Sequence, residues 1–180
     1  MRADARRNRD RLVAVAQEVF AEQGAGASLD DIAKRAGVGP GTLYRHFPTR
    51  EALQEAAYRD AVAELVQRGR DLAGELPPGP ALEAWVALLI AHMRDRSALA
   101  GALVEAMGKQ GEVFVESHGL LHEVGALLVD AARAGGAVRE DVQERDLLWM
   151  AHGVAQSAAG AGGDERVARL QEVLLRGLRP

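Results

Sequence analysis

The chain has 180 residues, 48% hydrophobic and 27% charged, so it can bury a sizeable core and is neither disordered nor fibrous. It contains no cysteine, which excludes disulfide frameworks and the usual structural zinc sites. Its amino terminus is charged and no apolar stretch approaches the roughly 18 residues of a membrane span. We therefore expect no signal peptide, no membrane partner and a cytoplasmic location.

The net charge of −4 is unevenly distributed along the chain. Residues 1–50 hold 9 of the 22 Lys and Arg and 6 of the 26 Asp and Glu, a sum of +3, whereas the other 130 residues sum to −7. A basic amino-terminal segment joined to an acidic body indicates a nucleic-acid footprint confined to one module.

A first helix is predicted over residues 8–23, where apolar residues recur at three- and four-residue spacing. Its other sides carry the polar residues Arg9, Arg11, Gln17, Glu18 and Glu22. A second, short helix follows, with Ser28 as a suitable N-cap and Asp31 three positions later. Gly37 ends it and turns the chain, because glycine takes positive φ without steric cost.

A third helix starts with Pro40, whose missing N–H is harmless in a first turn. Leu43 and Phe47 are four residues apart and face inward together. The outward face then carries Gly41, Thr42, Tyr44, Arg45 and His46. Two helices joined by a tight glycine turn, the second with hydroxyl, aromatic and cationic groups outside, predict a helix-turn-helix that places a recognition helix in the DNA major groove.

The rest of the chain is also predicted to be helical. Thr49 caps a long helix to about residue 76 that links the two parts, and Pro77–Pro80 is the strongest breaker. Five more helices are expected, the fourth of these capped by Asp141. The fold class is therefore all-α with about nine helices: a three-helix DNA-binding domain at residues 1–50 and a helical ligand-binding and dimerisation domain at residues 51–180.

The pattern SLDDIAKRAGVGPGTLYRHFPTREAL resembles the TetR family of bacterial transcriptional regulators, over about residues 8–55. The resemblance implies a homodimer, a ligand cavity among helices four to eight, and a dimer bundle from helices eight and nine. Mapped residue by residue, it implies phosphate contacts from Thr42, Tyr44, His46 and Arg50 and base contacts from Pro40, Gly41, Thr42 and Arg45, with Ser28 and Gly39 at the helix starts. Many relatives carry serine or threonine at Gly39, so one phosphate contact is expected to be lost.

Large or adaptable side chains of the carboxyl-terminal part predict a mostly apolar effector site. They are Trp85, His92, Met93, Met107, Phe114, His118, Trp149, His152 and Gln156. Each of them also suits an ordinary core. His118 and His122 have the spacing of a helical metal pair, which His92 or His152 would complete, but no matched carboxylate or cysteine cluster accompanies them, so we expect no metal and no cofactor.

Small and apolar residues of the last two helices predict the contacts of a homodimer. They are Ala151, Ala155, Ala158 and Ala159 on one helix, and Val167, Leu170, Leu174 and Leu178 on the other. The same residues could equally close the core of one subunit.

The predicted function is a ligand-responsive transcriptional regulator, and repression is favoured over activation. A homodimer binds a pseudo-palindromic operator of double-stranded DNA, and an unknown small-molecule effector releases it. One alternative is a chromosome-organisation or cell-division factor on the same scaffold, without an inducer. The other is a helical enzyme or metal sensor with a vestigial helix-turn-helix, but no catalytic motif is present and GVGPG at residues 37–41 follows a helix instead of a strand, so we expect no enzyme.

Overall fold

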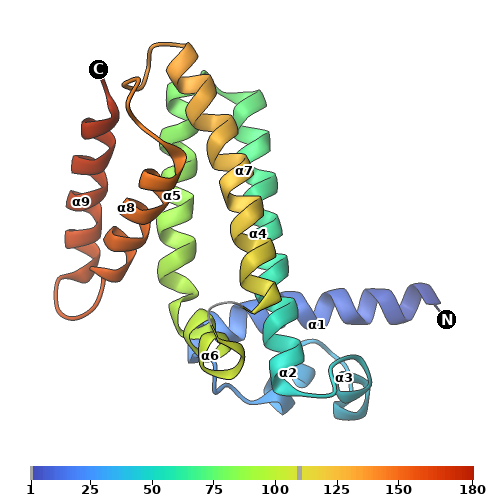
Figure 1. Ribbon diagram of the computed structural model, residues 1–180. Coiled ribbons are helices and arrows are strands. Elements are labelled where there is room, and N and C mark those ends of the chain that lie inside the picture. The colour runs from blue at the N-terminus through green and yellow to red at the C-terminus, as the bar shows by residue number, and fades with distance from the viewer. Residues whose placement is uncertain (1, 109–110) are drawn as a thin grey trace. The chain divides into compact units, whose positions relative to one another are not determined.

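A computed structural model describes residues 2–108 and 111–180, which form nine α-helices (Figure 1). They are α1 (Arg2–Gln23), α2 (Leu29–Arg35), α3 (Pro40–His46), α4 (Arg50–Glu75), α5 (Pro78–Asp95), α6 (Ser97–Met107), α7 (Glu112–Ala134), α8 (Glu144–Gln156) and α9 (Gly163–Leu178). The all-α class expected from the sequence is confirmed. Within the described ranges, no helix is both long enough and apolar enough to cross a membrane.

Some helix starts differ from the predicted ones. Asp141 does not cap α8: the helix begins at Glu144, with Gln143 in the N-cap position. The carboxylate of Asp141 instead accepts hydrogen bonds from the guanidinium of Arg139, at 2.8 and 2.9 Å, since a charged donor two residues away is a stronger partner than a backbone N–H. The first helix starts at Arg2 because its Arg- and Ala-rich beginning favours helix over coil.

The helices pack into two compact units, neither of which is continuous in sequence. The first unit comprises residues up to Val62 together with Arg96–Val115, and the second comprises Ala63–Asp95 together with Glu116–Pro180. Helix α4 therefore begins in the first unit and ends in the second. The packing groups α6 and the first half of α4 with the helix-turn-helix, while the division predicted at residue 50 stays a prediction.

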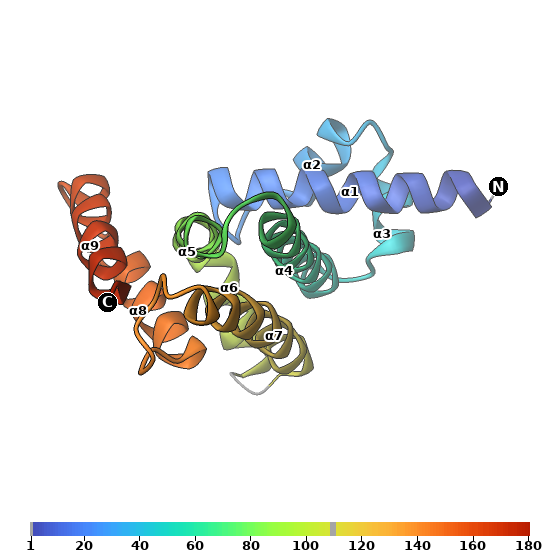
Figure 2. The same cartoon turned by 90° about the horizontal axis from the view of Figure 1, so that it is seen from above.

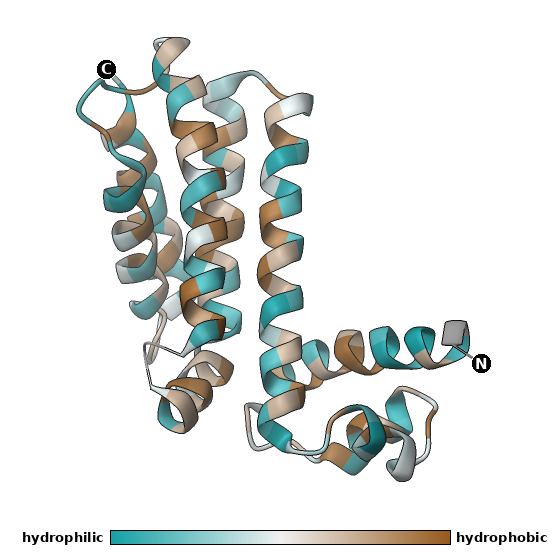
Figure 3. Ribbon diagram, turned by 45° about the vertical axis from the view of Figure 1, so that its right-hand side comes forward, coloured by the Kyte–Doolittle hydropathy of each residue, from teal (hydrophilic) through white to brown (hydrophobic). Residues whose placement is uncertain are grey.

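In the first unit, α1 crosses α2 and α3 and shares one apolar core with them (Figure 2). The core side chains are each at most 3% exposed: Leu12, Ala16, Val19, Phe20, Ile32, Leu43, Phe47 and Leu53. These include the residues that helical spacing predicts to face inward. The amino-terminal end of α1, by contrast, is hydrophilic (Figure 3).

A buried polar residue, Gln17, joins three elements of the first unit. Its side chain on α1 is only 7% exposed, although we expected it on the polar side of that helix. Its Nε2 donates to Oδ2 of Asp60 on α4 at 2.9 Å, and its Oε1 accepts from Nη2 of Arg96, just before α6, at 3.0 Å. Since a buried amide is costly without partners, these two bonds fix where α6 meets α1.

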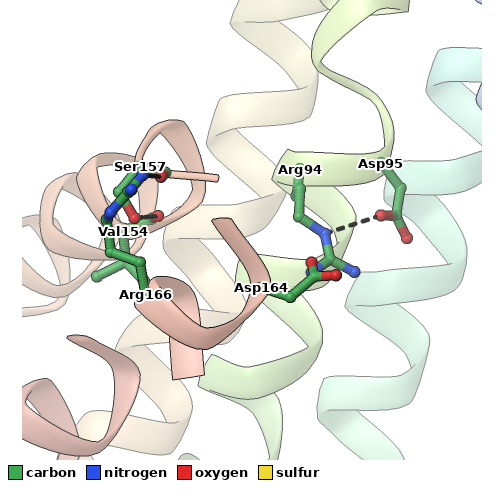
Figure 4. Close-up of polar contacts among 6 residues, drawn as sticks. All are labelled: Arg94, Asp95, Val154, Ser157, Asp164 and Arg166. Atoms are coloured by element: carbon green, nitrogen blue, oxygen red, sulfur yellow. Dashed lines mark hydrogen bonds and ion pairs between the residues drawn. The ribbon is translucent and has the colours of Figure 1, made fainter. Parts of the chain in front are cut away.

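In the second unit, α5 packs against α8, and α8 against α9. Helix α5 buries Trp85 and Leu89 completely. An ion pair between Arg94 and Asp164, 3.1 Å long, joins the end of α5 to the start of α9 (Figure 4). Arg166 donates to the carbonyl of Ser157 at 2.7 Å and so closes the turn between α8 and α9. The ion pair is exposed and contributes little stability, so this unit depends mainly on apolar burial.

Candidate nucleic-acid interface

The turn of the helix-turn-helix forms as the sequence predicts. Ser28 caps α2, its Oγ accepting a hydrogen bond from the N–H of Asp31 at 3.4 Å. Gly37 has φ +66°, a conformation that glycine adopts without strain. The N–H of Val38 then donates to the carbonyl of Ala33 at 3.0 Å, which satisfies an end group of α2 and directs the chain into α3.

Helix α3 is anchored by its apolar side and presents a polar side. Leu43 and Phe47 are 1% and 3% exposed, so the inward pair is confirmed. Of the residues on this helix predicted to contact DNA, Pro40, Gly41, Tyr44 and Arg45 are exposed, and Thr42 and His46 are half-buried. Gly39 occupies the N-cap position without a side-chain bond. This face is therefore free to meet base edges and phosphates, while the buried side holds the helix in place.

Arg50, which the sequence predicts as a phosphate contact, has a structural role in the folded chain. Its Nη1 donates to the carbonyl oxygens of Ala27, at 2.6 Å, and Ala25, at 3.3 Å. Gln54, one turn further along α4 and 3% exposed, donates to the same Ala25 carbonyl at 2.9 Å. The beginning of α4 thus holds the loop before α2. Nothing in the local sequence pattern predicts this, because the partners are backbone carbonyls more than twenty residues away.

Replacing Arg50 by alanine is expected to lower the free energy of unfolding by about 1–2 kcal/mol, because charge-assisted bonds to two loop carbonyls are lost. Urea denaturation followed by circular dichroism measures this. Arg45→Ala provides the matched control, since Arg45 is exposed and its loss should change stability by less than about 0.5 kcal/mol. Equal stability of the two variants would contradict the structural role of Arg50.

Other lysine and arginine side chains of α1, α2 and α3 differ in whether they contact neighbouring side chains. Arg35 bonds Oε2 of Glu22 at 2.8 Å and pairs with Asp31 at 3.1 Å, and the hydrogen bond to Glu22 contributes most to raising its pKa. The guanidinium of Arg9 lies over the ring of Phe47, 5.5 Å from its centroid. Lys34 and Arg45 are exposed. The positive charge expected near DNA is therefore partly committed to holding α1, α2 and α3 together.

Comparison with known proteins identifies the class to which this helix-turn-helix belongs. Residues 12–57 match the family described as bacterial regulatory proteins, tetR family, and residues 77–180 match the C-terminal domain of SbtR-like transcriptional regulators. The chain belongs to the TetR family. TetR-family proteins are DNA-binding transcriptional regulators and not enzymes, so the resemblance found in residues 8–55 is confirmed and extends over most of the chain.

Solved structures of TetR-family regulators match the whole fold. A TetR transcriptional regulator from Streptomyces coelicolor is 41% identical, with 96% of this chain and 98% of that chain covered and a TM-score of 0.84. A TetR regulatory protein from Mycobacterium vanbaalenii is 34% identical, with 99% of both chains covered and a TM-score of 0.74. HTH-type transcriptional regulators of Staphylococcus aureus are 46% identical over 54 residues, which span 29% of this chain and 29% of their own length.

The residues predicted for an effector site are dispersed. Met107 and Phe114 belong to the first unit, where Phe114 packs edge-on against Tyr58 with ring centroids 5.4 Å apart. In the second unit Trp85 is fully buried and His92 and Met93 are half-buried. His118, His152 and Gln156 are exposed, and Trp149 is 74% exposed. Trp85 is therefore buried, whereas the three effector residues predicted on α8, Trp149, His152 and Gln156, lie on the exposed side of that helix.

A small histidine cluster lies between α7 and α8. Although His118 is exposed as a residue, partial desolvation of its imidazole lowers its pKa, and the charges of His122 and His152 lower it further when protonated. Nδ1 of His122 is 3.7 Å from Oε1 of Glu144. Among the described residues, no group of three or more potential ligands is arranged to hold a metal ion. The cluster therefore offers a titratable group and no preformed metal site.

The protein is expected to lose stability as the pH falls below about 6.5, because the unfolded chain then binds a proton that folded His118 resists. The contribution of His118 to the free energy of unfolding is fully present above that pH and is lost as the pH falls through the lowered pKa of the folded state. Melting temperatures between pH 7.5 and 5 test this. His118→Gln should flatten the dependence, whereas His46→Gln, in the other unit, should not. An unchanged slope in His118→Gln would rule out this contribution.

Most residues predicted for the dimer contact lie inside the subunit. Ala151, Ala155, Val167, Leu174 and Leu178 are each at most 8% exposed. Ala158 is half-buried, Ala159 is exposed, and Leu170 is 39% exposed. The exposed apolar side chains of α8 and α9 are instead Trp149, Met150, Leu170 and Val173. Helical spacing identifies the apolar stripe correctly but cannot tell which part faces the subunit's own core.

Proposed function

We propose that this TetR-family regulator is a homodimeric repressor that binds a pseudo-palindromic operator and is released by a small molecule. The single observation that carries the DNA-binding part is the capped helix-turn-helix, with Tyr44 and Arg45 exposed on a helix anchored by buried Leu43 and Phe47. The exposed hydroxyl, ring and guanidinium are the groups that contact phosphates and base edges.

The dimer follows from two requirements. Recognition helices must sit about 34–36 Å apart to enter successive major grooves, and one chain carries one such helix. The exposed apolar residues of α8 and α9, above all Trp149 at 74%, supply a surface whose burial favours association. We assign the dimer contact to Trp149, Met150, Leu170 and Val173.

Release by an effector requires that the effector binds the DNA-competent conformation less well than another one. Helix α4 is the structural candidate for coupling, because it is one continuous helix. Its first half binds the loop before α2 through Gln54, and its second half lies against Trp85 of α5 and Val124 of α7 at Gly69. Linkage is reciprocal, so operator DNA should weaken effector binding by the same factor.

Selection of bound duplexes from random DNA tests this function. The expected result is an inverted repeat with half-site centres about one helical turn apart, bound by two chains. Candidate metabolites are then screened for release of the selected duplex. Recovery of no preferred sequence would refute operator recognition. Binding that no metabolite changes, at many chromosomal sites, would favour a chromosome-organising factor.

A further inference from the structure

Trp85 is a buried aromatic residue with an unsatisfied polar atom. The side chain is 0% exposed, and its indole Nε1 has no hydrogen-bond partner among the residues that the structure describes. A buried N–H without an acceptor has lost its bonds to water and gained none, which costs free energy. This donor is therefore available to any acceptor that can reach it.

Trp85 lies against a glycine of each of two neighbouring helices, and the contact with Gly69 is the tighter one. A methyl group added at Gly69 of α4 would lie 2.8 Å from both Nε1 and Cδ1 of Trp85 and 2.7 Å from Cγ2 of Val124 on α7. A methyl group at Gly125 of α7 would lie 3.4 Å from Cη2, at the opposite edge of the ring. Gly69 is thus what lets α4 approach Trp85 and Val124 so closely, whereas at Gly125 an added methyl would make an ordinary contact with the ring.

This packing controls access to the donor. The edge of the indole that carries Nε1 faces the backbone of Gly69, and the space there does not admit even one more carbon atom. An acceptor atom can pair with Nε1 only if the indole turns or α4 withdraws. Forming that hydrogen bond therefore disturbs the contact between Trp85 and Gly69, either at the indole or at α4.

We propose that Trp85 is the anchoring donor of the effector site and that Gly69 is the contact that the effector opens. This rests on the effector-responsive function proposed above and specifies its chemistry. The effector is an uncharged, largely apolar molecule with a carbonyl, ester or ether oxygen that accepts from Nε1. A carboxylate is excluded, because one N–H cannot offset the cost of burying an anion among apolar side chains.

A pair of glycine substitutions on α4 tests the coupling without an effector. A methyl at Gly69 would collide with Trp85, whereas a methyl at Gly74 would meet nothing within 4 Å. We expect Gly69→Ala to weaken binding of the selected operator duplex by about tenfold, within the usual range of allosteric coupling, and Gly74→Ala to leave it within about twofold. Fluorescence anisotropy of the labelled duplex measures both.

A second substitution shows whether the effect passes through the indole. Trp85→Phe removes the pyrrole edge that the Gly69 methyl would meet and leaves the contact with Cγ2 of Val124, so the double variant should regain part of the lost operator affinity. A folded Gly69→Ala protein with wild-type affinity, or a double variant as weak as the single one, would overturn the proposal. If Gly69→Ala does not fold, the following measurement decides alone.

The indole N–H can be observed directly. The chain has two tryptophans, so a ¹⁵N-labelled sample of the whole protein gives two indole N–H signals, and Trp85→Phe identifies that of Trp85. Cyclohexanone, a neutral ketone, should shift this signal downfield saturably and leave the Trp149 signal in place. Methylcyclohexane and cyclohexanecarboxylate provide the hydrocarbon and anionic controls.

These experiments distinguish a failure of the Trp85 proposal from a failure of the proposed regulator function. No shift with cyclohexanone, or an equal shift with methylcyclohexane, would contradict a donor role for Trp85. Failure of the wild-type protein to bind any selected duplex would instead contradict the proposed function itself. A downfield shift together with lower operator affinity in cyclohexanone would support both.

Discussion

Alanine at position 45 is expected to weaken operator binding by about 5- to 150-fold, the effect of losing 1–3 kcal/mol from one base-edge contact. Arg45 is exposed on α3, so its removal takes nothing from the core. Because a guanidinium that reads a base edge discriminates between bases, Arg45→Ala should also accept substitutions at one operator position that the wild type rejects. Anisotropy titrations with the selected duplex and its single-base variants measure both effects.

Tyr44→Ala should behave differently from Arg45→Ala. Its 49% exposed hydroxyl-bearing ring is assigned to a phosphate, so binding should weaken by a similar factor on every duplex, without relaxed specificity. Arg70→Ala, which removes an exposed arginine from the distant half of α4, controls for the loss of charge alone. Wild-type affinity in both α3 variants would mean that this face does not read DNA.

Glutamate at position 149 is expected to convert the dimer to a monomer and to lower operator affinity by about 100-fold or more. Trp149 is 74% exposed in the single subunit, and buried tryptophans are frequent hot spots of protein interfaces. A monomer binds only one operator half-site and therefore loses the higher affinity that comes from binding both half-sites at once. Sedimentation equilibrium and anisotropy titrations on the same samples test the link between the two losses.

Leu76→Glu is the matched control for this substitution. Leu76 is also an exposed apolar residue, at 39%, but it follows α4 and lies outside α8 and α9. It should leave the sedimentation behaviour unchanged. A Trp149→Glu protein that still sediments as a dimer would remove α8 from the interface, and a wild-type monomer would leave the proposed half-site spacing without a basis.

Local signals explain how much of this molecule can be predicted from sequence. Ser28, Gly37 and Pro40 act on backbone groups within four residues of themselves, so their pattern predicts the helix ends without knowledge of the fold. Leu43 and Phe47 are similar, since helical periodicity alone places them on the inward side. The helix-turn-helix was predictable because it consists almost entirely of such short-range features.

Features that join distant segments could not be predicted in this way. Gln17 has the composition of a surface residue, and only its bonds to Asp60 and Arg96, 43 and 79 residues away, make it a core residue. Arg50 of α4 binds carbonyls of the loop before α2, and Trp85 of α5 lies directly against Gly69 of α4. The effector and dimer residues were the least predictable for the same reason: an apolar side chain on a helix suits a core, a pocket or an interface equally.

The bond between Arg96 and Gln17 limits how this protein can be divided or recombined. The part that reads DNA is completed by α6, which lies beyond α5 in the chain, so it is not a detachable amino-terminal cassette. A hybrid regulator joined at Pro77 would pair this helix-turn-helix with a foreign α6 and lose the partner of a buried amide. A workable exchange keeps Arg96–Met107 with the reading half and grafts foreign sequence on either side of it.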